Sequence, residues 1–432
     1  MNEKTTNVYE ADNLDYHHQL SEILNKLDGL NILAEVVIGV PFSRESEETV
    51  QSTLVKIQEG LEKYYPDKHF LLIALGESCS GVQINNILPP KVENIEFHGF
   101  HKYKNLIGKG WSMRMFVDIA NHFNSHAVFF DADVSNIEYE WIKILLEPLF
   151  IKGKQCCVIP TVHRGAHDAE TTNNLAFPLL SALYGKAPRH PLGGLRSFTS
   201  DVVKELASFT DTISNTSWFS ESVSGYGIDI FYTIFSLKSG ATIEEPYLGY
   251  ISHSSLPVVD NGYKKAITQI VGSMFGFVEM DHAGWNLVQM EEITEKIETL
   301  FPPDADALAY LMAFKDNFLD NSTLTRKIVR PEIFPEIEHH YRADAKNIYL
   351  SPNTWAKIVY DFILYFHQAV SEEKRNILEA IFPIYCLRVG SFFRELQADA
   401  DILNIENVVK LTAQNFKTNS TNFINDWKKL KH

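Results

Sequence analysis

The sequence predicts an α/β protein with a mostly parallel sheet, followed by a helical domain. Short apolar runs alternate with amphipathic helical patterns through roughly the first 260 residues, as in successive strand–helix–strand units. Beyond about residue 265 the apolar positions recur at helical spacing almost throughout. A chain of 432 residues has room for two or three domains. We expect an N-terminal helical extension at 1–34, an α/β domain at 35–265 and a C-terminal helical domain at 266–432.

The elements of the α/β part follow in order. The first is a helical pattern at 14–33, and a β-branched run at 35–40 then ends at Pro41, as a buried strand would. An amphipathic helix at 50–64 comes next, with apolar residues three and four positions apart. Four further strands are expected at 70–75, 95–97, 126–130 and 155–160, and helical patterns at 113–120 and 141–149 flank the third of them.

The C-terminal part has three candidate helices, at 308–314, 355–366 and 377–387. Pro383 lies inside the third and could kink it. These helices either pack on the α/β domain or form a homodimer interface, and the sequence leaves both possibilities open.

Composition narrows the class of function. The net charge is −16 and no dense Lys/Arg cluster is visible, which argues against nucleic acid or an anionic membrane as the main partner. The four cysteines include no Cys-x-x-Cys pair, and Cys156 and Cys157 lie in an apolar run that predicts buried thiols. No signal peptide and no run of about 18 apolar residues is apparent, so we expect a cytoplasmic protein without a transmembrane segment.

Candidate ligand-contacting residues stand where the predicted strands end. Pro41, Glu77 and Asp131 all occupy such positions, and ligands bind beyond the carboxyl ends of parallel strands. Asp131 and Asp133 form an Asp-x-Asp pair directly after the strand at 126–130. Two carboxylates at one strand end are suitable ligands for Mg²⁺ or Mn²⁺ bridged to a diphosphate.

Several further motifs follow one another in a fixed order. They are Val40-Pro41-Phe42-Ser43-Arg44-Glu45, Gly108-Lys109-Gly110, Asp131-Ala132-Asp133, His190-Pro191-Leu192-Gly193-Gly194, Gly225-Tyr226-Gly227-Ile228-Asp229 and Ile251-Ser252-His253. Over roughly residues 35–260 this order resembles the retaining GT-A glycosyltransferases that make glucosyl-3-phosphoglycerate, and more loosely the mannosylglycerate synthases.

The resemblance implies a GT-A fold and a nucleoside-diphosphate-sugar donor, with UDP-glucose favoured. It implies hexose transfer to a small polar acceptor such as 3-phosphoglycerate or glycerate, with Mg²⁺ or Mn²⁺ as cofactor. The implied donor-binding residues are Pro41, Phe42, Glu45, Ser78, Lys109, Asp131, Ala132 and Asp133. The implied metal ligands are Asp133, Asp131 and His253, the acceptor-binding residues are Arg164, Thr172, Leu192, Gly193 and Gly194, and the catalytic residues are Asp229 and Lys109.

These residue types suit the chemistry of donor cleavage. The departing diphosphate gains negative charge, which a divalent cation and Lys109 can oppose without proton transfer. Asp229 takes a positioning and electrostatic role near the sugar, since retaining GT-A enzymes usually show no covalent nucleophile.

The sequence departs from the family pattern at the acceptor. The family arginines around the metal histidine are absent near His253, and Glu170 stands where an arginine would hold the acceptor's phosphate. A carboxylate there should repel 3-phosphoglycerate. The residues that could supply a substitute charge are Arg164, Lys186, Arg189 and Arg196.

Two other functions stay open. A phosphatase of the haloacid-dehalogenase type also places Asp-x-Asp at a strand end, but normally on the first strand of its domain. A catalytically silent sugar-nucleotide binder or scaffold would explain the missing arginines. Locally, Gly108-Lys109-Gly110 and 191–194 could be simple turns, Asp229 an ordinary acid at a helix start, and His253 a structural histidine.

Overall fold

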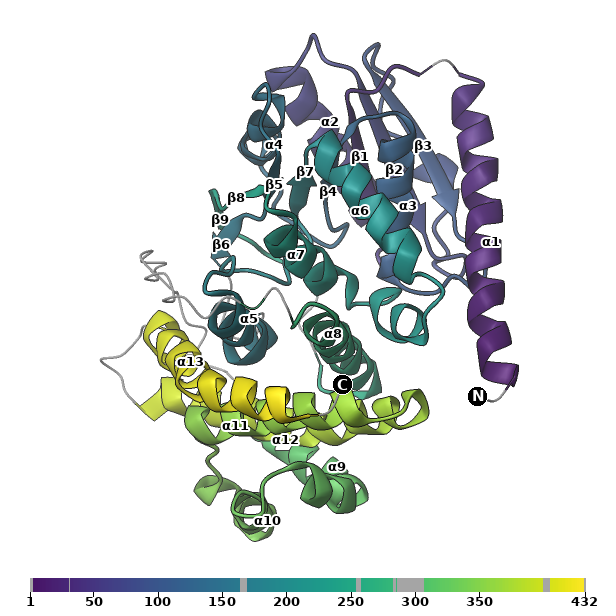
Figure 1. Ribbon diagram of the computed structural model, residues 1–432. Coiled ribbons are helices and arrows are strands. Elements are labelled where there is room, and N and C mark those ends of the chain that lie inside the picture. Colours follow the sequence, from purple (N-terminus) through teal and green to yellow (C-terminus); the bar gives the residue numbers. More distant parts are fainter. Residues whose placement is uncertain are drawn as a thin grey trace. The chain divides into compact units, whose positions relative to one another are not determined.

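The computed structural model describes residues 3–30, 32–163, 169–253, 258–282, 285, 307–398 and 405–430. The chain divides into two compact units (Figure 1). Unit 1 comprises Met1–Val162 and Leu192–Ser255, and unit 2 comprises His163–Pro191 and Leu256–His432.

Unit 1 is built on a seven-stranded, mostly parallel sheet in the order β3-β2-β1-β4-β7-β5-β8. The pairs β1–β2, β2–β3, β1–β4 and β5–β8 are parallel, and β7 is antiparallel to both of its neighbours. The strands are β1 (Val36–Phe42), β2 (Phe70–Gly76), β3 (Ile95–His101), β4 (His126–Phe129), β5 (Cys156–Val158), β7 (Arg196–Phe198) and β8 (Thr242–Glu244), while β6 (Thr161–His163) and β9 (Tyr247–Tyr250) form a separate pair.

The chain order reverses between β1 and β4. The chain runs from β1 outward through β2 to β3 and then returns to add β4 on the other side of β1. The crevice beyond the carboxyl ends of such strands is where doubly wound sheets bind ligands. The predicted strand ends at Pro41 and Asp131 therefore meet at this reversal.

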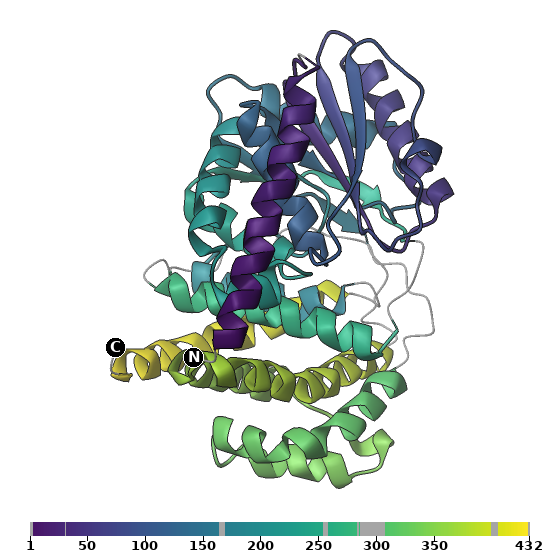
Figure 2. The same ribbon diagram turned by 90° about the vertical axis from the view of Figure 1, so that its right-hand side faces the viewer.

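Helices cover both faces of the sheet (Figures 1 and 2). α2 (Glu47–Tyr64) and α4 (Tyr139–Leu146) bury their apolar sides against Val36, Ile38 and Val40 of β1. On the opposite face lie α3 (Lys109–His122), α6 (Ser200–Ile213) and α7 (Ile228–Ser239), with Phe116 of α3 stacked on Phe129 of β4. The long helix α1 (Glu3–Asp28) packs along α3.

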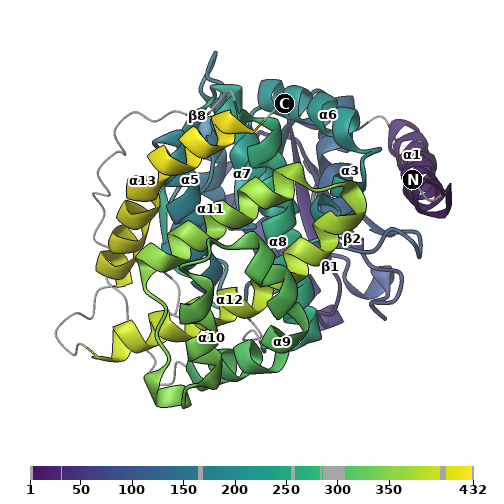
Figure 3. The ribbon, with the colours of Figure 1, turned by 60° about the horizontal axis from the view of Figure 1, so that its bottom comes forward.

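Unit 2 is helical. It consists of α5 (Phe177–Tyr184), α8 (Asn261–Met280), α9 (Ala307–Ile328), α10 (Phe334–Arg342), α11 (Pro352–Gln368), α12 (Ser371–Ala398) and α13 (Ile405–Lys429). Here α12 packs on α9, and α13 packs on α11 and α5 (Figure 3). Short turns of helix complete both units at Ile84–Asn86, Glu147–Phe150, Thr172–Ala176, Phe219–Val223 and Ala345–Asn347. The α/β class with a mostly parallel sheet and a C-terminal helical region is thus confirmed.

The division of the chain differs from the expected boundary at residue 266. Residues 163–191 interrupt unit 1 in the sequence and belong to unit 2, and α1 belongs to unit 1. Two contacts anchor that segment: Arg189 forms an ion pair with Glu406 at 2.6 Å, and the indole of Trp355 donates to the Asn174 carbonyl at 2.7 Å. Their partners lie about 180 to 217 positions away, beyond the reach of local patterns.

One helix among the described residues passes a test of length and apolarity for a membrane span, Ser371–Leu396 within α12. However, 89% of the window is buried inside the protein, as in an ordinary core helix. The α12 helix continues through Pro383. Cys156 and Cys157 are buried free thiols, as predicted.

Candidate functional site

Carboxylates collect at the reversal between β1 and β4. The amide of Phe130 donates to the Gly39 carbonyl at 3.0 Å, which continues the β1–β4 pairing up to Asp131. Burial raises the pKa of Asp133, and the nearby charges of Asp131 and Glu45 raise it further, against the opposing effects of His253 and Lys109. The strand ends therefore bring three predicted acidic residues to one place, where their mutual repulsion disfavours ionisation of Asp133.

Lys109 is shared between two of the predicted carboxylates. It is the first residue of α3, and its ammonium lies 2.6 Å from Oδ1 of Asp131 and 2.9 Å from Oδ2 of Asp229. Burial disfavours the charged ammonium, but the attraction of Asp131 and Asp229 outweighs it and raises the pKa of Lys109. Lys109 is thus a permanent cation that connects the end of β4 to the start of α7.

Asp229 lies in the first turn of α7, where the helix dipole favours an acid. Burial raises the pKa of its carboxyl, although Lys109 and Arg196 counteract this effect. The Oδ1 atom is buried and has no hydrogen-bond partner, with the Arg196 guanidinium 3.7 Å away. The structure thus brings Asp229 to the predicted donor cluster with one oxygen incompletely satisfied.

Arg196 is a central residue that the sequence indicated only as a possible substitute charge for the acceptor. Its guanidinium is fully buried and donates to the carbonyls of Gly193 and Asp229, the latter at 3.0 Å. It thereby ties the 191–194 turn to α7. A signal for this role was present in the sequence, because a single arginine directly follows Gly193-Gly194-Leu195.

The glycines of two motifs are required by close packing. A Cβ on Gly108 would lie 2.5 Å from the carbonyl oxygen of Ser224, and Gly108 has φ +123°. A Cβ on Gly110 would lie 2.0 Å from the carbonyl oxygen of Val223. A Cβ on Gly194 would lie 1.8 Å from Oδ2 of Asp131. Both motifs are therefore tight turns, and both bring backbone up to the charged cluster.

A buried ion pair that the sequence did not reveal holds the start of α3. Lys102 lies 2.9 Å from Glu77 Oε1, and its ammonium also donates to the Gly108 carbonyl at 2.6 Å. The same Glu77 oxygen accepts from the Gly108 amide at 2.8 Å. Burial lowers the pKa of Lys102, and Glu77 opposes that shift. This pair fixes Gly108, and with it the position of Lys109.

The remaining donor-site residues occupy different environments. The Phe42 ring is buried against Gly76, so its side chain belongs to the core, and its donor contact stays a prediction. Ser78 is exposed in the loop after β2, and Glu45 accepts from the Ser43 and Arg44 amides in the loop after β1. Ala132 is buried, and its carbonyl accepts from Thr53. Pro41 pairs with Leu75 in the β1–β2 register.

The metal ligand set is chemically suitable but is not assembled. His253 lies beside the Asp-x-Asp turn through its bridge to Val134, and it acts electrostatically on Asp133. Two carboxylates and an imidazole suit a divalent cation. Among the described residues, however, no three His, Cys, Asp or Glu side chains are grouped closely enough to hold a metal. The ammonium of Lys109 lies against Asp131 instead.

The predicted acceptor residues divide between the units. Leu192, Gly193 and Gly194 are in unit 1, and Thr172 is a buried residue of unit 2. Arg164 lies outside the described residues. Their common role stays a prediction.

Glu170 lies in a buried tyrosine cluster of unit 2. Tyr263 donates to Glu170 at 2.7 Å and lies 2.9 Å from the hydroxyl of Tyr385. Thr171 Oγ1 is 2.7 Å from the same Tyr385 hydroxyl. The substitution Glu170→Arg would disrupt this network. Its effect on activity would therefore not report the charge of the acceptor alone.

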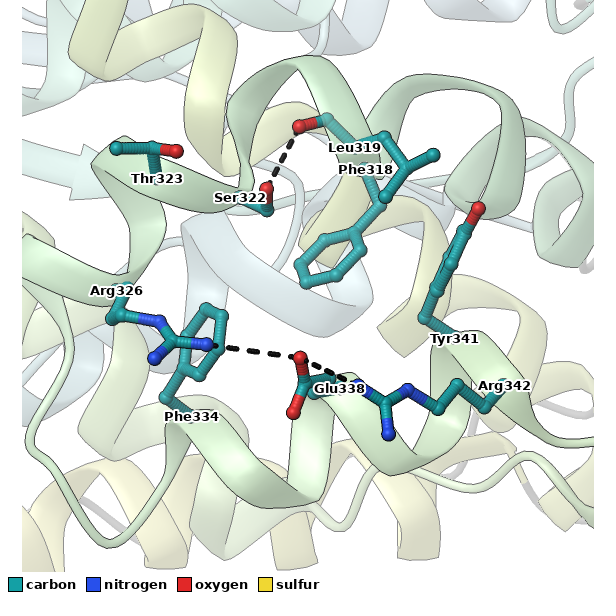
Figure 4. A pocket seen from close by; sticks show the side chains of 9 residues that line it. All are labelled: Phe318, Leu319, Ser322, Thr323, Arg326, Phe334, Glu338, Tyr341 and Arg342. Atoms are coloured by element: carbon teal, nitrogen blue, oxygen red, sulfur yellow. Dashed lines mark hydrogen bonds and ion pairs between the residues drawn. The ribbon is translucent and has the colours of Figure 1, made fainter.

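A separate pocket of about 270 Å³ lies between α9 and α10 in unit 2 (Figure 4). Glu338 at its rim pairs with Arg342 at 2.9 Å and lies 3.7 Å from Arg326. None of the residues that line it is a predicted site residue: Phe318, Leu319, Ser322, Thr323, Arg326, Phe334, Glu338, Tyr341 and Arg342.

Comparison with known proteins gives a weak structural likeness. No family model and no curated protein matches the sequence. Glucosyl-3-phosphoglycerate synthase from Mycobacterium tuberculosis, in complex with Mn²⁺, UDP-glucose and phosphoglyceric acid, is similar at 17% identity and a TM-score of 0.38, over 55% of this chain and 79% of that chain. The same enzyme with Mg²⁺ and UDP gives 17% and 0.37, over 55% and 79%. A mycobacterial protein gives 16% and 0.37, over 56% and 74%. Likenesses of this TM-score do not define the family or the activity.

Proposed function

We propose that the protein is a glycosyltransferase of the GT-A type that takes a hexose from a nucleoside-diphosphate sugar, with UDP-glucose favoured. The acceptor is a small polar molecule such as 3-phosphoglycerate or glycerate, and a divalent cation, Mg²⁺ or Mn²⁺, takes part. The donor, the acceptor and retention of configuration come from the sequence resemblance.

The observation that carries the proposal is the cluster at the β1–β4 reversal. Asp131 and Asp133 follow β4 at the position where doubly wound sheets bind nucleotides, and Lys109 is within ion-pair distance of Asp131. A phosphatase of the haloacid-dehalogenase type is not favoured, because the Asp-x-Asp pair follows the fourth strand of the chain, not the first.

Each residue has a chemical role in this proposal. A bound divalent cation would offset the charge on the departing diphosphate. The Lys109 ammonium opposes the same charge from the start of α3. Asp229, oriented by Lys109 and Arg196, faces the sugar as a positioning carboxylate. Gly194 permits the 191–194 turn to approach Asp131.

Ligand-induced thermal stabilisation tests the donor site. The purified chain is melted with UDP, GDP, ADP and their hexose conjugates, in Mn²⁺ and in EDTA. We expect a metal-dependent shift with one nucleotide, because a ligand at a hundred times its Kd adds about 2.7 kcal/mol of stability. Asp133→Ala should weaken that binding by about a hundredfold or more, since it removes a carboxylate from the predicted cation site.

Asp67→Ala is the matched control, because Asp67 is an exposed turn residue of the same unit. It should bind like the wild type. Equal nucleotide affinity of Asp133→Ala and wild type in saturating Mn²⁺ would contradict the proposal. Metal-dependent binding with neither hydrolysis of the donor nor transfer to any acceptor would favour the silent binder.

A further inference from the structure

Both oxygens of the Asp131 carboxylate face protein groups. Oδ1 is 2.6 Å from the Lys109 ammonium. A Cβ on Gly194 would lie 1.8 Å from Oδ2 and 2.5 Å from Oδ1, so the Gly194 backbone covers one side of the carboxylate. The Gly194 side is backbone, whereas the Lys109 side is the end of a flexible side chain. Asp131 can therefore present an oxygen to a new cation most readily on the side where Lys109 now lies.

Lys109 has a second partner that it can keep. Its ammonium is 2.9 Å from Oδ2 of Asp229, whose other oxygen is buried without a hydrogen bond. If the ammonium moves away from Asp131, it retains an ion pair with Asp229 and does not become an unpaired buried charge. The cost of releasing Asp131 is thereby reduced.

In the described residues Asp133, unlike Asp131, has no ammonium or guanidinium at ion-pair distance. In the described part of the chain its carboxylate forms no hydrogen bond or ion pair, and like charges from Asp131 and Glu45 lie near it. A divalent cation would relieve this repulsion, but its approach to Asp131 is opposed by the ammonium already there.

We propose that Lys109 and the divalent cation compete for Asp131, so that Lys109 closes the metal site in the nucleotide-free protein and moves onto Asp229 when the cation binds. This inference rests on the metal site of the proposed function and adds its regulation. Lys109 then acts in opposite directions on two ligands. It weakens binding of the cation alone, and it strengthens binding of the nucleoside diphosphate, whose charge it opposes.

Mn²⁺ binding to the nucleotide-free full-length chain tests the competition, with the electron paramagnetic resonance signal of free Mn²⁺ as the readout. The four proteins are wild type, Lys109→Met, Asp131→Asn and the double variant. We expect Lys109→Met to bind Mn²⁺ about ten- to a hundredfold more tightly than wild type, because a like charge leaves the site. In the Asp131→Asn background the same substitution should change the affinity less than about threefold, since the contested carboxylate is gone.

The double-variant cycle separates competition at Asp131 from a general loss of positive charge. Arg44→Met is the matched control, because it removes one exposed cation from the neighbouring loop after β1 and should leave Mn²⁺ affinity unchanged. Lys109→Gln repeats the test with a polar side chain if Lys109→Met folds poorly, which the melting temperature reveals.

Each outcome has one meaning. Unchanged or weaker Mn²⁺ binding by Lys109→Met, or an equal gain in the Asp131→Asn background, overturns the competition and leaves the metal site of the proposed function standing. No Mn²⁺ binding by wild type or any variant, with or without nucleotide, overturns the metal site itself and the competition with it.

Discussion

Two cations, the buried Arg388 in unit 2 and the partly buried Lys109 in unit 1, are partnered in contrasting ways. The Arg388 guanidinium holds Glu395 through two parallel hydrogen bonds of 2.7 Å, and its remaining donors reach Asn174 at 3.0 Å and the Leu350 carbonyl at 2.9 Å. Lys109 instead is shared by Asp131 and Asp229, with Asp133 close by. One group has matched charges, and the other has more carboxylates than adjacent cations.

This difference distinguishes a structural contact, around Arg388, from the proposed donor site, around Lys109. A bidentate pair in which every guanidinium nitrogen has a hydrogen-bond partner has a single favoured arrangement and holds distant segments together. A cluster with raised carboxyl pKa values and an incompletely satisfied oxygen gains stability when a cation enters, and perturbed ionisation of this kind concentrates at functional sites. Three predictions test this contrast, from the largest expected effect to the smallest.

Breaking the matched pair should cost the most stability. Arg388→Met leaves Glu395 without its bidentate partner and removes the contact to Asn174, and loss of one member of a buried pair costs about 3–5 kcal/mol. Urea denaturation measures the change in the free energy of unfolding. Arg375→Met on the same helix is the control: its pair with Glu379 is exposed, so the cost should stay below about 1 kcal/mol. Equal, small costs for both variants would mean that the Arg388 pair is not structural.

Crowding the site should affect function more than stability. Gly194→Ala puts a methyl group 1.8 Å from Oδ2 of Asp131, so the Asp131 carboxylate must leave its present position beside Lys109. We expect nucleotide-sugar turnover to fall by about a hundredfold, the usual result of a displacement of about 1 Å at a reacting site. Steady-state kinetics and melting temperature are measured together. Gly29→Ala, whose methyl group would meet only ordinary contacts at 3.6 Å, should leave both unchanged. Wild-type turnover in Gly194→Ala would show that Asp131 does not need its present position.

The sequence predicted the parts of the molecule that depend on local pattern. The periodicity of apolar residues located β1 to β5 and their helices, and the Asp-x-Asp pair was correctly assigned to the end of a strand. The parallel order then brings Asp131 and Asp133 to the reversal beside β1, which is a consequence of topology.

Long-range partners account for what the sequence did not predict. The place of residues 163–191 in unit 2 depends on Arg189 and Glu406, which lie 217 positions apart. The packing of the Phe42 ring against Gly76 on the next strand is likewise a contact that no local pattern indicates. The role of Arg196 follows from two carbonyl groups, one of them on α7, that only the folded chain brings within its reach.

The smallest effect concerns the stability cost of the excess carboxylate. Burial, Asp131 and Glu45 raise the pKa of Asp133 in the folded protein, so between the unfolded and folded pKa values the folded state binds more protons and stability falls as pH rises. The cost grows as the pH rises from the unfolded to the folded pKa, and Asp133→Asn removes it. We expect Asp133→Asn to melt roughly 1–3 °C higher than wild type at pH 7.5 without metal. The gain should shrink as the pH falls and vanish toward about pH 3, below the ordinary pKa of an unfolded aspartate, where the carboxyl is protonated in both states. The exposed Asp67→Asn should show no pH-dependent gain, and a melting temperature of Asp133→Asn below that of wild type at pH 7.5 would mean that the Asp133 carboxylate stabilises the fold, as the matched charges around Arg388 do.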